Sequence, residues 1–391
     1  MASQSRRPDD VLAVDTSSDD DSPAVLGASV GRVVSTGPGT SFLDAVRAGL
    51  LAAEADRLAP RPDPHDERPA ESSATEWVWL LHDDSAPAPD ALERLLAAVE
   101  VAPSVAIAGC KLRAWDDGSR LLQTGFTVSR LGRTITGVEA GEVDQGQTDA
   151  REDVLAVGSA GMLVRRDVWD ALDGPDPATP LVGDDLDLCM RARLAGHRVV
   201  VVPGAVVAHA DATRTGQRET GSGRRELWWL SRRQVTHRRL VDARAPLLPL
   251  TVLTVLLGGL ARALVRMATK EPGRAVGELT AVVSALSRPD DVWRARRRHA
   301  RVRRVPRRTI TQLRATHGEV ARWHRDRWQH RRVQRRAALV PVERRVPTAG
   351  GLKVPVLGTL VLAAVSGIAL HRLVGPGPVS GGALAPAPGD L

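Results

Sequence analysis

Short apolar runs recur along the first half of the chain, and two of them end in clusters of polar residues. They are Val11–Val14, Trp77–Leu81, Val105–Gly109 and Val199–Val202. Short apolar runs bounded by polar or turn-forming residues are typical of strands that are buried in a sheet. The first run leads into the acidic loop 15–22, and the second leads into His82-Asp83-Asp84. Carboxylates therefore follow directly after two of the expected strands.

Segments with helical spacing lie between these runs. They are residues 40–54, 89–101 and 183–196. Strands that alternate with helices predict an α/β domain with a mainly parallel sheet. Ligands of such sheets bind beyond the carboxyl ends of the strands, which is where Asp15, Asp83 and Asp84 are expected to lie.

The remaining segments of this half are less regular. Gly31–Ser35 predicts a second strand, so the expected order begins with two strands and then a helix. Leu121–Thr136 predicts a hairpin-like stretch. Residues 57–75 are rich in Pro, Asp, Glu and Ser and have no periodicity, which predicts a surface loop.

Two uncharged apolar runs in the second half predict association with a membrane. Ala245–Ala261 and Val354–Leu370 are each 17 residues long, at the lower edge of the roughly 17–25 residues that a spanning helix needs. A buried core helix is the alternative for each run. Met1–Asp10 is polar and has no apolar stretch of the kind found in signal peptides, so the N-terminal domain is expected in the cytoplasm.

Composition excludes several classes of protein. The hydrophobic fraction of 43% and the charged fraction of 26% are ordinary for a globular protein, so the chain as a whole is not disordered. Its two cysteines, Cys110 and Cys189, are too few for a zinc cluster or a disulfide framework. A redox function is therefore not expected.

Charge divides the chain into two contrasting parts. Residues 224–353 carry 32 Lys and Arg against 9 Asp and Glu, although the net charge of the whole chain is only +8. The remainder has a net charge of −15, which lies in residues 1–223. An acidic domain does not bind polyanions by bulk charge, so a phosphate bound there needs a metal or a few aimed donors. The basic part suits anionic lipid or nucleic acid.

The basic half is expected to meet lipid. Residues 224–244 hold seven Arg and two adjacent Trp, a composition that suits an interfacial helix. Both flanks of Ala245–Ala261 are basic, so a single crossing there would break the positive-inside rule on one side. The expected segments are interfacial or re-entrant helices over 224–287, an Arg-rich helical or partly disordered segment over 288–353, one transmembrane helix over 354–370 and a flexible tail over 371–391.

Binding of nucleic acid by the Arg-rich segment is the alternative function of this half. Trp323 and Trp328 stand among arginines and could stack on bases. The segment has no RNA-binding motif, and polybasic segments beside a membrane commonly attract anionic lipid. Anionic membrane lipid is therefore the expected partner, and nucleic acid is not.

Three segments of the acidic half resemble the successive motifs of inverting family-2 glycosyltransferases of the GT-A fold, as found in bacterial, membrane-associated members. They are VDTSSDDDS (Val14–Ser22), WLLHDDSAPAPDAL (Trp79–Leu92) and GDDLDLCMRARLAGHRVVVVPGAVVAHA (Gly183–Ala210). The resemblance covers about Val11–Gly216 and implies a Rossmann-like sheet for a domain over residues 1–223. Members of the family begin with a further strand and helix, whereas ten mostly polar residues precede Val11 here.

The resemblance implies a site for a nucleotide-diphosphate sugar. In the family, the aspartates of a D-x-D motif hold Mg²⁺ or Mn²⁺ against the diphosphate, and His82-Asp83-Asp84 stands at this place. His82 replaces the first Asp, which leaves Asp84 as the expected metal ligand and Asp83 as a partner of the ribose. His209 matches a metal-binding histidine of many members, and Asp15 matches an acid that contacts the nucleoside.

Asp184-Asp185 resembles the acidic pair whose second member acts as the general base. A carboxylate at this place accepts the proton of an acceptor hydroxyl, which attacks the anomeric carbon opposite the diphosphate and inverts its configuration. Three acids, with Asp187, open this expected helix, and helix N-termini favour acidic residues in any case. Three exceed what capping requires, so at least one is expected to be functional.

These implications lead to one expected function and one alternative. The chain is expected to transfer a sugar from a nucleotide-diphosphate sugar to a glycan or lipid-linked acceptor in cell-envelope synthesis, at the cell membrane with its catalytic domain in the cytoplasm. The alternative is a catalytically inactive scaffold that binds a sugar nucleotide. His82 at the first D-x-D position and the missing first strand favour that alternative.

Overall fold

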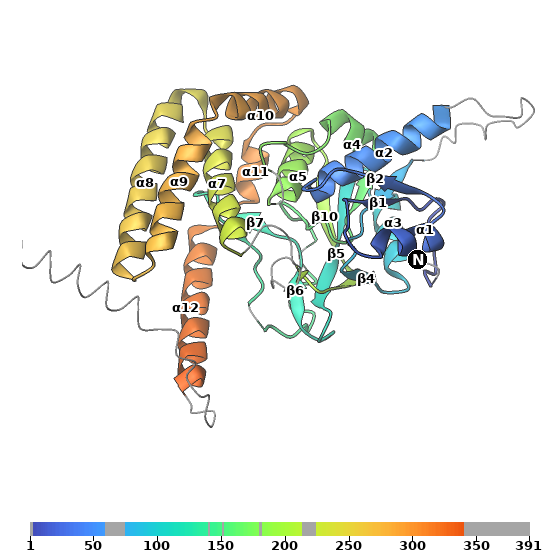
Figure 1. Ribbon diagram of the computed structural model, residues 1–391, viewed down its shortest axis with the longest axis horizontal. Helices are drawn as coiled ribbons and strands as arrows, with labels where there is room; N and C mark the ends of the chain where they lie inside the picture. The colour runs from blue at the N-terminus through green and yellow to red at the C-terminus, as the bar shows by residue number, and fades with distance from the viewer. Residues whose placement is uncertain are drawn as a thin grey trace, which may run out of the picture. The chain divides into compact units, whose positions relative to one another are not determined.

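The computed structural model describes residues 3–58, 75–139, 141–150, 152–179, 182–212 and 224–339 (Figure 1). The chain divides into two units, Met1–Arg331 and Arg332–Leu391. The acidic and basic halves, as far as Arg331, therefore form one compact unit. The expected transmembrane helix 354–370 and the tail 371–391 lie outside the described residues.

The chain begins with a small parallel sheet and two helices. Strand β1 (Ala13–Asp15) pairs in parallel with β2 (Val33–Ser35), and α2 (Phe42–Leu58) follows. Helix α1 (Ser22–Ser29) lies between the two strands and was not predicted, because its eight residues bury no side chain and show no apolar stripe. Helix α2 continues to Leu58, and residues 59–74 of the predicted surface loop lie outside the described residues.

The main sheet is mixed rather than mainly parallel, which corrects that part of the prediction. Its strand order is β3-β9-β5-β10-β4, with β6 also paired to β5, and only the long pair β5–β10 is parallel. The short strands that pair antiparallel in this sheet have only three residues each, and a run this short does not show the direction of its partner. The strands are β3 (Trp77–Trp79), β4 (Ser85–Pro87), β5 (Val105–Ala114), β6 (Leu121–Gln123), β9 (Leu163–Arg165) and β10 (Arg198–His209).

Helices cover both faces of this sheet and confirm the α/β class. Alternate residues of a strand face opposite sides of a sheet, so Val199 and Val201 join the apolar cluster under α2, α4 (Arg166–Leu172) and α5 (Asp184–Leu194). Val200 joins the cluster under α3 (Ala91–Glu100) on the other face. The predicted hairpin within 121–136 is also confirmed, since β7 (Thr127–Val128) pairs antiparallel with β8 (Thr134–Ile135).

The basic half forms helices from Arg224 onward, and α7, α8 and α9 stand side by side in Figure 1. Buried hydrogen bonds join these helices to the α/β region, because Nε2 of His299 in α10 lies 2.8 Å from Oδ1 of Asp187 in α5 and Nε2 of His237 in α7 lies 3.2 Å from Oδ2 of Asp176. The elements are α7 (Arg224–Asp242), η1 (Ala245–Leu247), α8 (Leu248–Ala268), α9 (Pro272–Leu286), α10 (Pro289–Val302), α11 (Arg308–Gln312) and α12 (His317–Leu339).

One helix of the described residues, Ala245–Ala268, is long and apolar enough to cross a membrane. Only 17% of its most apolar window is buried within the molecule. Helix α8 turns back into α9 at Thr269–Glu271, where Lys270 takes a positive φ of 59°. The apolar run that predicted a membrane segment therefore forms the first arm of a helical hairpin.

The aromatic residues of α12 bear on the nucleic-acid alternative. The guanidinium groups of Arg133 and Arg327 lie 5.0 Å and 4.9 Å from the ring centre of Trp323. Arginine side chains thus already lie against this ring, while Trp328 is exposed. The structure adds no observation in favour of base stacking at Trp323.

Candidate active site

A cleft of about 3100 Å³ opens at the end of the α/β region where the apolar runs give way to carboxylates. Its walls come from β1 and the loop after it, from α2 and from the ends of β3 and β10. The predicted site residues that line it are Asp15, Asp83, Asp84, Asp184 and His209. Asp185 is not among the lining residues. The structure thus brings together five of the six residues that the sequence selected.

The register of two strands places His209 beside Asp84. Strand β10 pairs antiparallel with β4, and His209 stands opposite Ser85. The turn before β4 is closed by Ser85, whose backbone N–H donates to the carbonyl of His82 at 3.1 Å. The backbone N–H of Ala210 donates to the carbonyl of Asp84 at 2.9 Å. Two segments more than a hundred residues apart in sequence are therefore fixed against each other by backbone hydrogen bonds.

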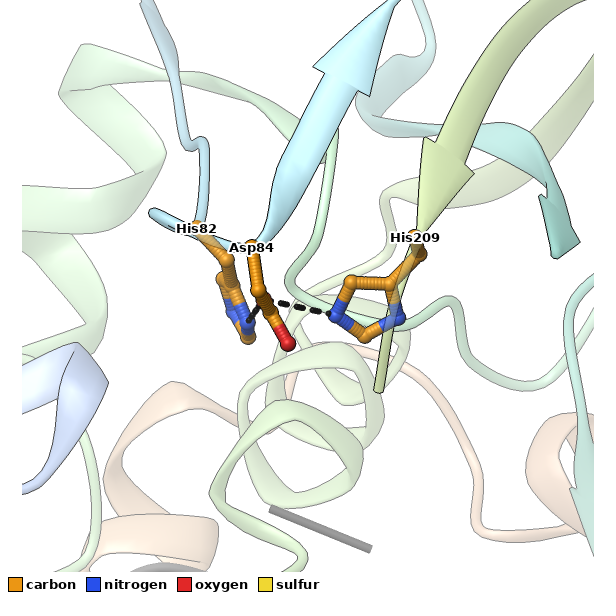
Figure 2. Close-up of side chains that lie close together, drawn as sticks. All are labelled: His82, Asp84 and His209. Carbon is orange, nitrogen blue, oxygen red and sulfur yellow. Dashed lines mark hydrogen bonds and ion pairs between the residues drawn. The ribbon is translucent and has the colours of Figure 1, made fainter. Parts of the chain in front are cut away.

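The carboxylate of Asp84 is the centre of this part of the cleft. Figure 2 shows it between the rings of His82 and His209. Its Oδ1 lies 3.1 Å from Nε2 of His209, and its Oδ2 accepts a hydrogen bond from the N–H of Ala212 at 2.9 Å. Burial would raise the pKa of Asp84, but these hydrogen bonds and the nearby imidazoles lower it to about 2. Asp84 is therefore ionised at neutral pH.

His82 belongs to the same group, although the sequence suggested that its presence weakens the metal site. Its Nδ1 lies 3.9 Å from Oδ1 of Asp84, and its Nε2 lies 2.9 Å from the hydroxyl of Ser159. One ligand atom from each of His82, Asp84 and His209 lies within 4.8 Å of the other two. Two imidazoles and a carboxylate are common metal ligands, so these side chains fit a divalent cation.

Ser159 was not selected from the sequence. It lies in the segment Gly158–Gly161. Gly161 has a φ of 82°, and a Cβ there would lie 2.9 Å from Val207, so the tight turn needs glycine. This turn carries Ser159 to the ring of His82, a relation that no local sequence signal reveals.

Asp15 and Asp83 line the cleft in different surroundings. Asp15 ends β1 and is 6% exposed, and its carboxylate accepts a hydrogen bond from the N–H of Ser18. This bond holds the turn that opens the loop after β1. Asp83 is exposed between His82 and Asp84. Both lie where the sequence placed a contact to the nucleotide, and Asp83 is the more accessible to a ligand.

The three acids that open α5 have separate roles in the structure. Asp187 is held by Nε of Arg191 at 2.7 Å and by His299 at 2.8 Å. Burial opposes ionisation, but these two partners lower the pKa of Asp187. Asp187 therefore joins α5 to α10, which leaves Asp184 and Asp185 for the cleft and its surroundings.

Asp184 and Asp185 are a coupled acidic pair. Asp184 is 8% exposed, and burial together with the charge of Asp185 raises its pKa to about 7. Burial also raises the pKa of Asp185, to about 6, while the charge of Arg238 opposes this rise. Each carboxylate accepts a hydrogen bond from the backbone N–H that follows it, at 2.9 Å and 2.6 Å. The pair thus changes its protonation close to neutral pH.

Arg238 of α7 is a residue that sequence analysis did not select. It is buried, and neither terminal nitrogen of its guanidinium has a hydrogen-bond partner among the described residues. A Cβ on Gly183 would lie 2.3 Å from the side chain of Gln234 and 2.9 Å from that of Arg238. Close packing of α7 against this glycine therefore places a buried positive charge at the start of α5.

Comparison with solved structures gives distant likenesses. GalNAc-T7 with UDP, GalNAc and Mn²⁺ is 12% identical with a TM-score of 0.37, over 52% of this chain and 39% of that one. S. aureus TarS 1-349 in complex with UDP is 13% identical with a TM-score of 0.37, over 64% of this chain and 62% of that one. At these scores the likeness bears on neither substrate nor mechanism.

Comparison of sequences identifies the family of this chain. The chain is 30% identical over 177 residues to the uncharacterized protein y4gI of Sinorhizobium fredii, a match that spans 42% of this chain and 19% of that relative's length. The model of the family described as glycosyltransferase like family 2 matches residues 33–236, about half of the chain. The match includes Asp83, Asp84, the acidic pair and His209, whereas Asp15 precedes it. It confirms the resemblance drawn from the motifs, and the chain belongs to the glycosyltransferase-like family 2.

Proposed function

We propose that the protein transfers a sugar from a nucleotide-diphosphate sugar to an acceptor hydroxyl, with inversion at the anomeric carbon. The observation that carries this proposal is the cleft, which gathers Asp15, Asp83, Asp84, Asp184 and His209 from separate segments of the chain. Asp15 and Asp184 are buried carboxylates, and a carboxylate costs free energy to ionise away from water. Asp83 and Asp84 join them at the same cleft. Their convergence beside a large open volume supports a ligand-binding role.

The donor is bound through its diphosphate and its nucleoside. Because the surrounding region is acidic, the diphosphate needs a cation, and Asp84 and His209 would hold Mg²⁺ or Mn²⁺. When bound, the cation would neutralise charge on the diphosphate as the bond to the sugar breaks. Asp83 and Asp15 contact the ribose or base of the donor.

Asp185 acts as the general base. It is half-buried and directly follows Asp184, which lines the cleft. Arg238 favours its ionised form, which is the form that accepts a proton. The hydroxyl oxygen bonds to the anomeric carbon while the diphosphate leaves from the opposite face, and this single displacement inverts the configuration.

The helices from Arg224 onward bring the enzyme to a membrane. Their exposed apolar side chains and many arginines suit a layer of anionic lipid, and the acceptor is a glycan or a lipid-linked sugar of the cell envelope. Residues 1–223 form the catalytic domain on the cytoplasmic face, residues 224–287 lie at or within the membrane, and residues 288–353 remain beside it. The crossing by residues 354–370 stays a prediction.

Calorimetry with UDP, GDP and dTDP, each with and without Mn²⁺, tests the donor site. We expect one of these nucleotides to bind only when Mn²⁺ is present, and Asp84→Asn to weaken that binding. Equally tight binding in EDTA would contradict the metal role. Release of nucleoside diphosphate from the matching sugar nucleotide in the presence of membrane lipid extract then tests transfer, and binding without any release would favour the inactive scaffold.

A further inference from the structure

We propose that His82 is a third metal ligand, and that the site takes a divalent first-row transition ion through two imidazole nitrogens and one carboxylate oxygen in preference to Mg²⁺. The role of the bound ion rests on the proposed function, whereas its binding by these three side chains does not. The ligand atoms are Nδ1 of His82, Oδ1 of Asp84 and Nε2 of His209.

The three atoms already converge on one point. Oδ1 of Asp84 lies 3.1 Å from Nε2 of His209 and 3.9 Å from Nδ1 of His82. Ligands that each lie about 2.0–2.2 Å from one ion are roughly 3–3.4 Å apart. The pair Asp84–His209 has this spacing, and an approach of His82 by less than about 1 Å completes the set.

The hydroxyl of Ser159 can accept a hydrogen bond from Nε2–H of His82, the arrangement in which Nδ1 binds the metal. Nε2 lies 2.9 Å from the hydroxyl oxygen of Ser159, so a proton on Nε2 leaves the lone pair of Nδ1 directed at Asp84. Metal-bound histidines commonly donate their other N–H to an oxygen in this way, which fixes the tautomer and the ring orientation.

Packing holds the same ring in place. The ring centre of Phe42 lies 4.0 Å from that of His82, and the rings of His82 and His209 meet edge to face at 5.5 Å. Asp84 is fixed through its other oxygen by the N–H of Ala212, which leaves Oδ1 toward the imidazoles. All three side chains are thus oriented before an ion arrives, as Figure 2 shows.

The chemistry of the ligands selects the ion. Mg²⁺ prefers oxygen ligands and gives up its water reluctantly. Imidazole suits Fe²⁺, Co²⁺, Ni²⁺ and Zn²⁺, and affinity for a given site rises along this row toward copper. Two nitrogens and one oxygen therefore favour these ions over Mg²⁺. Three protein ligands also leave positions free for oxygens of a diphosphate.

Titration of the metal-free full chain with Co²⁺ tests the inference without nucleotide or acceptor. Visible absorption and calorimetry are recorded, followed by competition with Mg²⁺. We expect Co²⁺ to bind at least about 100-fold more tightly than Mg²⁺. His82→Ala should weaken Co²⁺ binding about 10–100-fold and change the spectrum, and Ser159→Ala should weaken it by up to about 10-fold.

His82→Asp provides a variant that keeps a ligand at the same position. It should lower the preference for Co²⁺ over Mg²⁺ by at least about 10-fold, because a carboxylate oxygen replaces a nitrogen. His317→Ala, an exposed histidine at the start of α12, is the matched control and should bind Co²⁺ like the unaltered protein. Circular dichroism confirms that each variant is folded.

Two results would overturn the inference: a spectrum and affinity for Co²⁺ that do not change in His82→Ala and His82→Asp, or equal affinities for Co²⁺ and Mg²⁺ in the unaltered protein. These outcomes are independent of sugar transfer. If Co²⁺ binds through His82 but no sugar nucleotide binds, the metal site stands and the proposed function fails. If sugar is transferred while the His82 variants bind metal normally, the proposed function stands and the role of His82 as a ligand fails.

Discussion

The α/β region and the helices from Arg224 onward differ in which side chains they bury and which they expose. In the α/β region, Leu186 and Leu188 are fully buried, and carboxylates gather around an open cleft. In the helical region, Glu278 is 2% exposed and lies between Arg232 and Arg262, at 3.0 Å and 2.8 Å. The large apolar side chains of α8 that are exposed include Leu250, Leu253, Leu256, Leu257, Leu260 and Leu264.

This difference indicates which surroundings each region is built for. Exposed apolar surface costs about 25 cal/mol per Å² in water, so a row of exposed leucines is stable only against another apolar layer. Helix α8 has 21 residues and is about 31 Å long, close to the roughly 30 Å of a bilayer core. The α/β region presents charged groups at its cleft, whereas α8 presents apolar side chains, which is the basis of the membrane contact proposed above.

In the α/β region, Asp185→Asn is the substitution with the largest expected effect on the rate of sugar transfer. The amide keeps the shape of the carboxylate but accepts no proton, so sugar transfer should fall by about 10²–10⁴-fold. Affinity for the nucleotide should hardly change, since Asp185 does not line the cleft. Initial rates of nucleoside diphosphate release, with calorimetry of the nucleotide alone, measure both quantities.

Asp84→Asn is the matched contrast, because it should weaken binding of the nucleotide with metal as well as turnover. A near-normal rate for Asp185→Asn together with loss of activity in Asp184→Asn would assign the base to Asp184. Normal rates for both variants would contradict the proposed mechanism.

Glu278→Gln tests the buried charge of the helical region. The change leaves Arg232 and Arg262 without a counter-charge, and breaking a buried ion pair costs about 3–5 kcal/mol. We expect about 2–4 kcal/mol here, because the side chain of Arg262 is 37% exposed. Urea unfolding of the full chain measures the loss. Asp90→Asn, which removes an exposed pair with Arg94 in α3, should cost less than about 1 kcal/mol.

Replacing Leu250, Leu253 and Leu257 by Ser tests the apolar surface of α8. These residues are exposed in the structure, so folding should be little affected. Loss of their burial in lipid should weaken binding to vesicles that contain anionic lipid by about 30-fold, or roughly 2 kcal/mol. Sedimentation with vesicles measures this binding. The control changes exposed Leu51 and Val101 to Ser in the α/β region, and equal losses for both sets would remove the proposed role of α8.

The elements that the sequence predicted well are those with strong local signals. Helices α2, α3 and α5 have apolar periodicity, and β5 and β10 contain long apolar runs. The acids at the ends of strands were therefore placed at the cleft before the structure was known. The mixed pairing of the sheet was missed because strands of three residues, such as β9, take their partners from tertiary packing.

The parts of the site that escaped prediction depend on contacts between distant segments. Ser159 reaches His82 across 77 residues of sequence, and Arg238 reaches the start of α5 from the basic half. Compared with the D-x-D motif alone, His82 indicated the loss of an aspartate from the metal site. Its position beside Asp84 and His209 follows from the register of β10 on β4, which no local pattern encodes.

The pH dependence of transfer should follow Asp185. The base must be ionised, and burial places the titration of the acidic pair near pH 6–7, so the rate should rise with pH through this range. Asp184 has the higher pKa, about 7, and is still protonated while Asp185 ionises near 6, so Asp184→Asn should leave the acid limb of kcat in place. Rates of both proteins between pH 5 and 8 test this expectation, and a limb displaced by about one unit or more would contradict it.

Asp184→Asn and Asp187→Asn should change the melting temperature in opposite directions. The folded state raises the pKa of Asp184, so this group's stabilising contribution is present below about pH 4 and is lost as pH rises toward about 7. Asn carries no charge, so Asp184→Asn should raise the melting temperature more at pH 8 than at pH 5. The folded state lowers the pKa of Asp187, so its contribution is present at neutral pH, and Asp187→Asn should lower the melting temperature at both values. If Asp184→Asn also destabilised the protein at pH 8, its carboxylate would be a structural partner like Asp187.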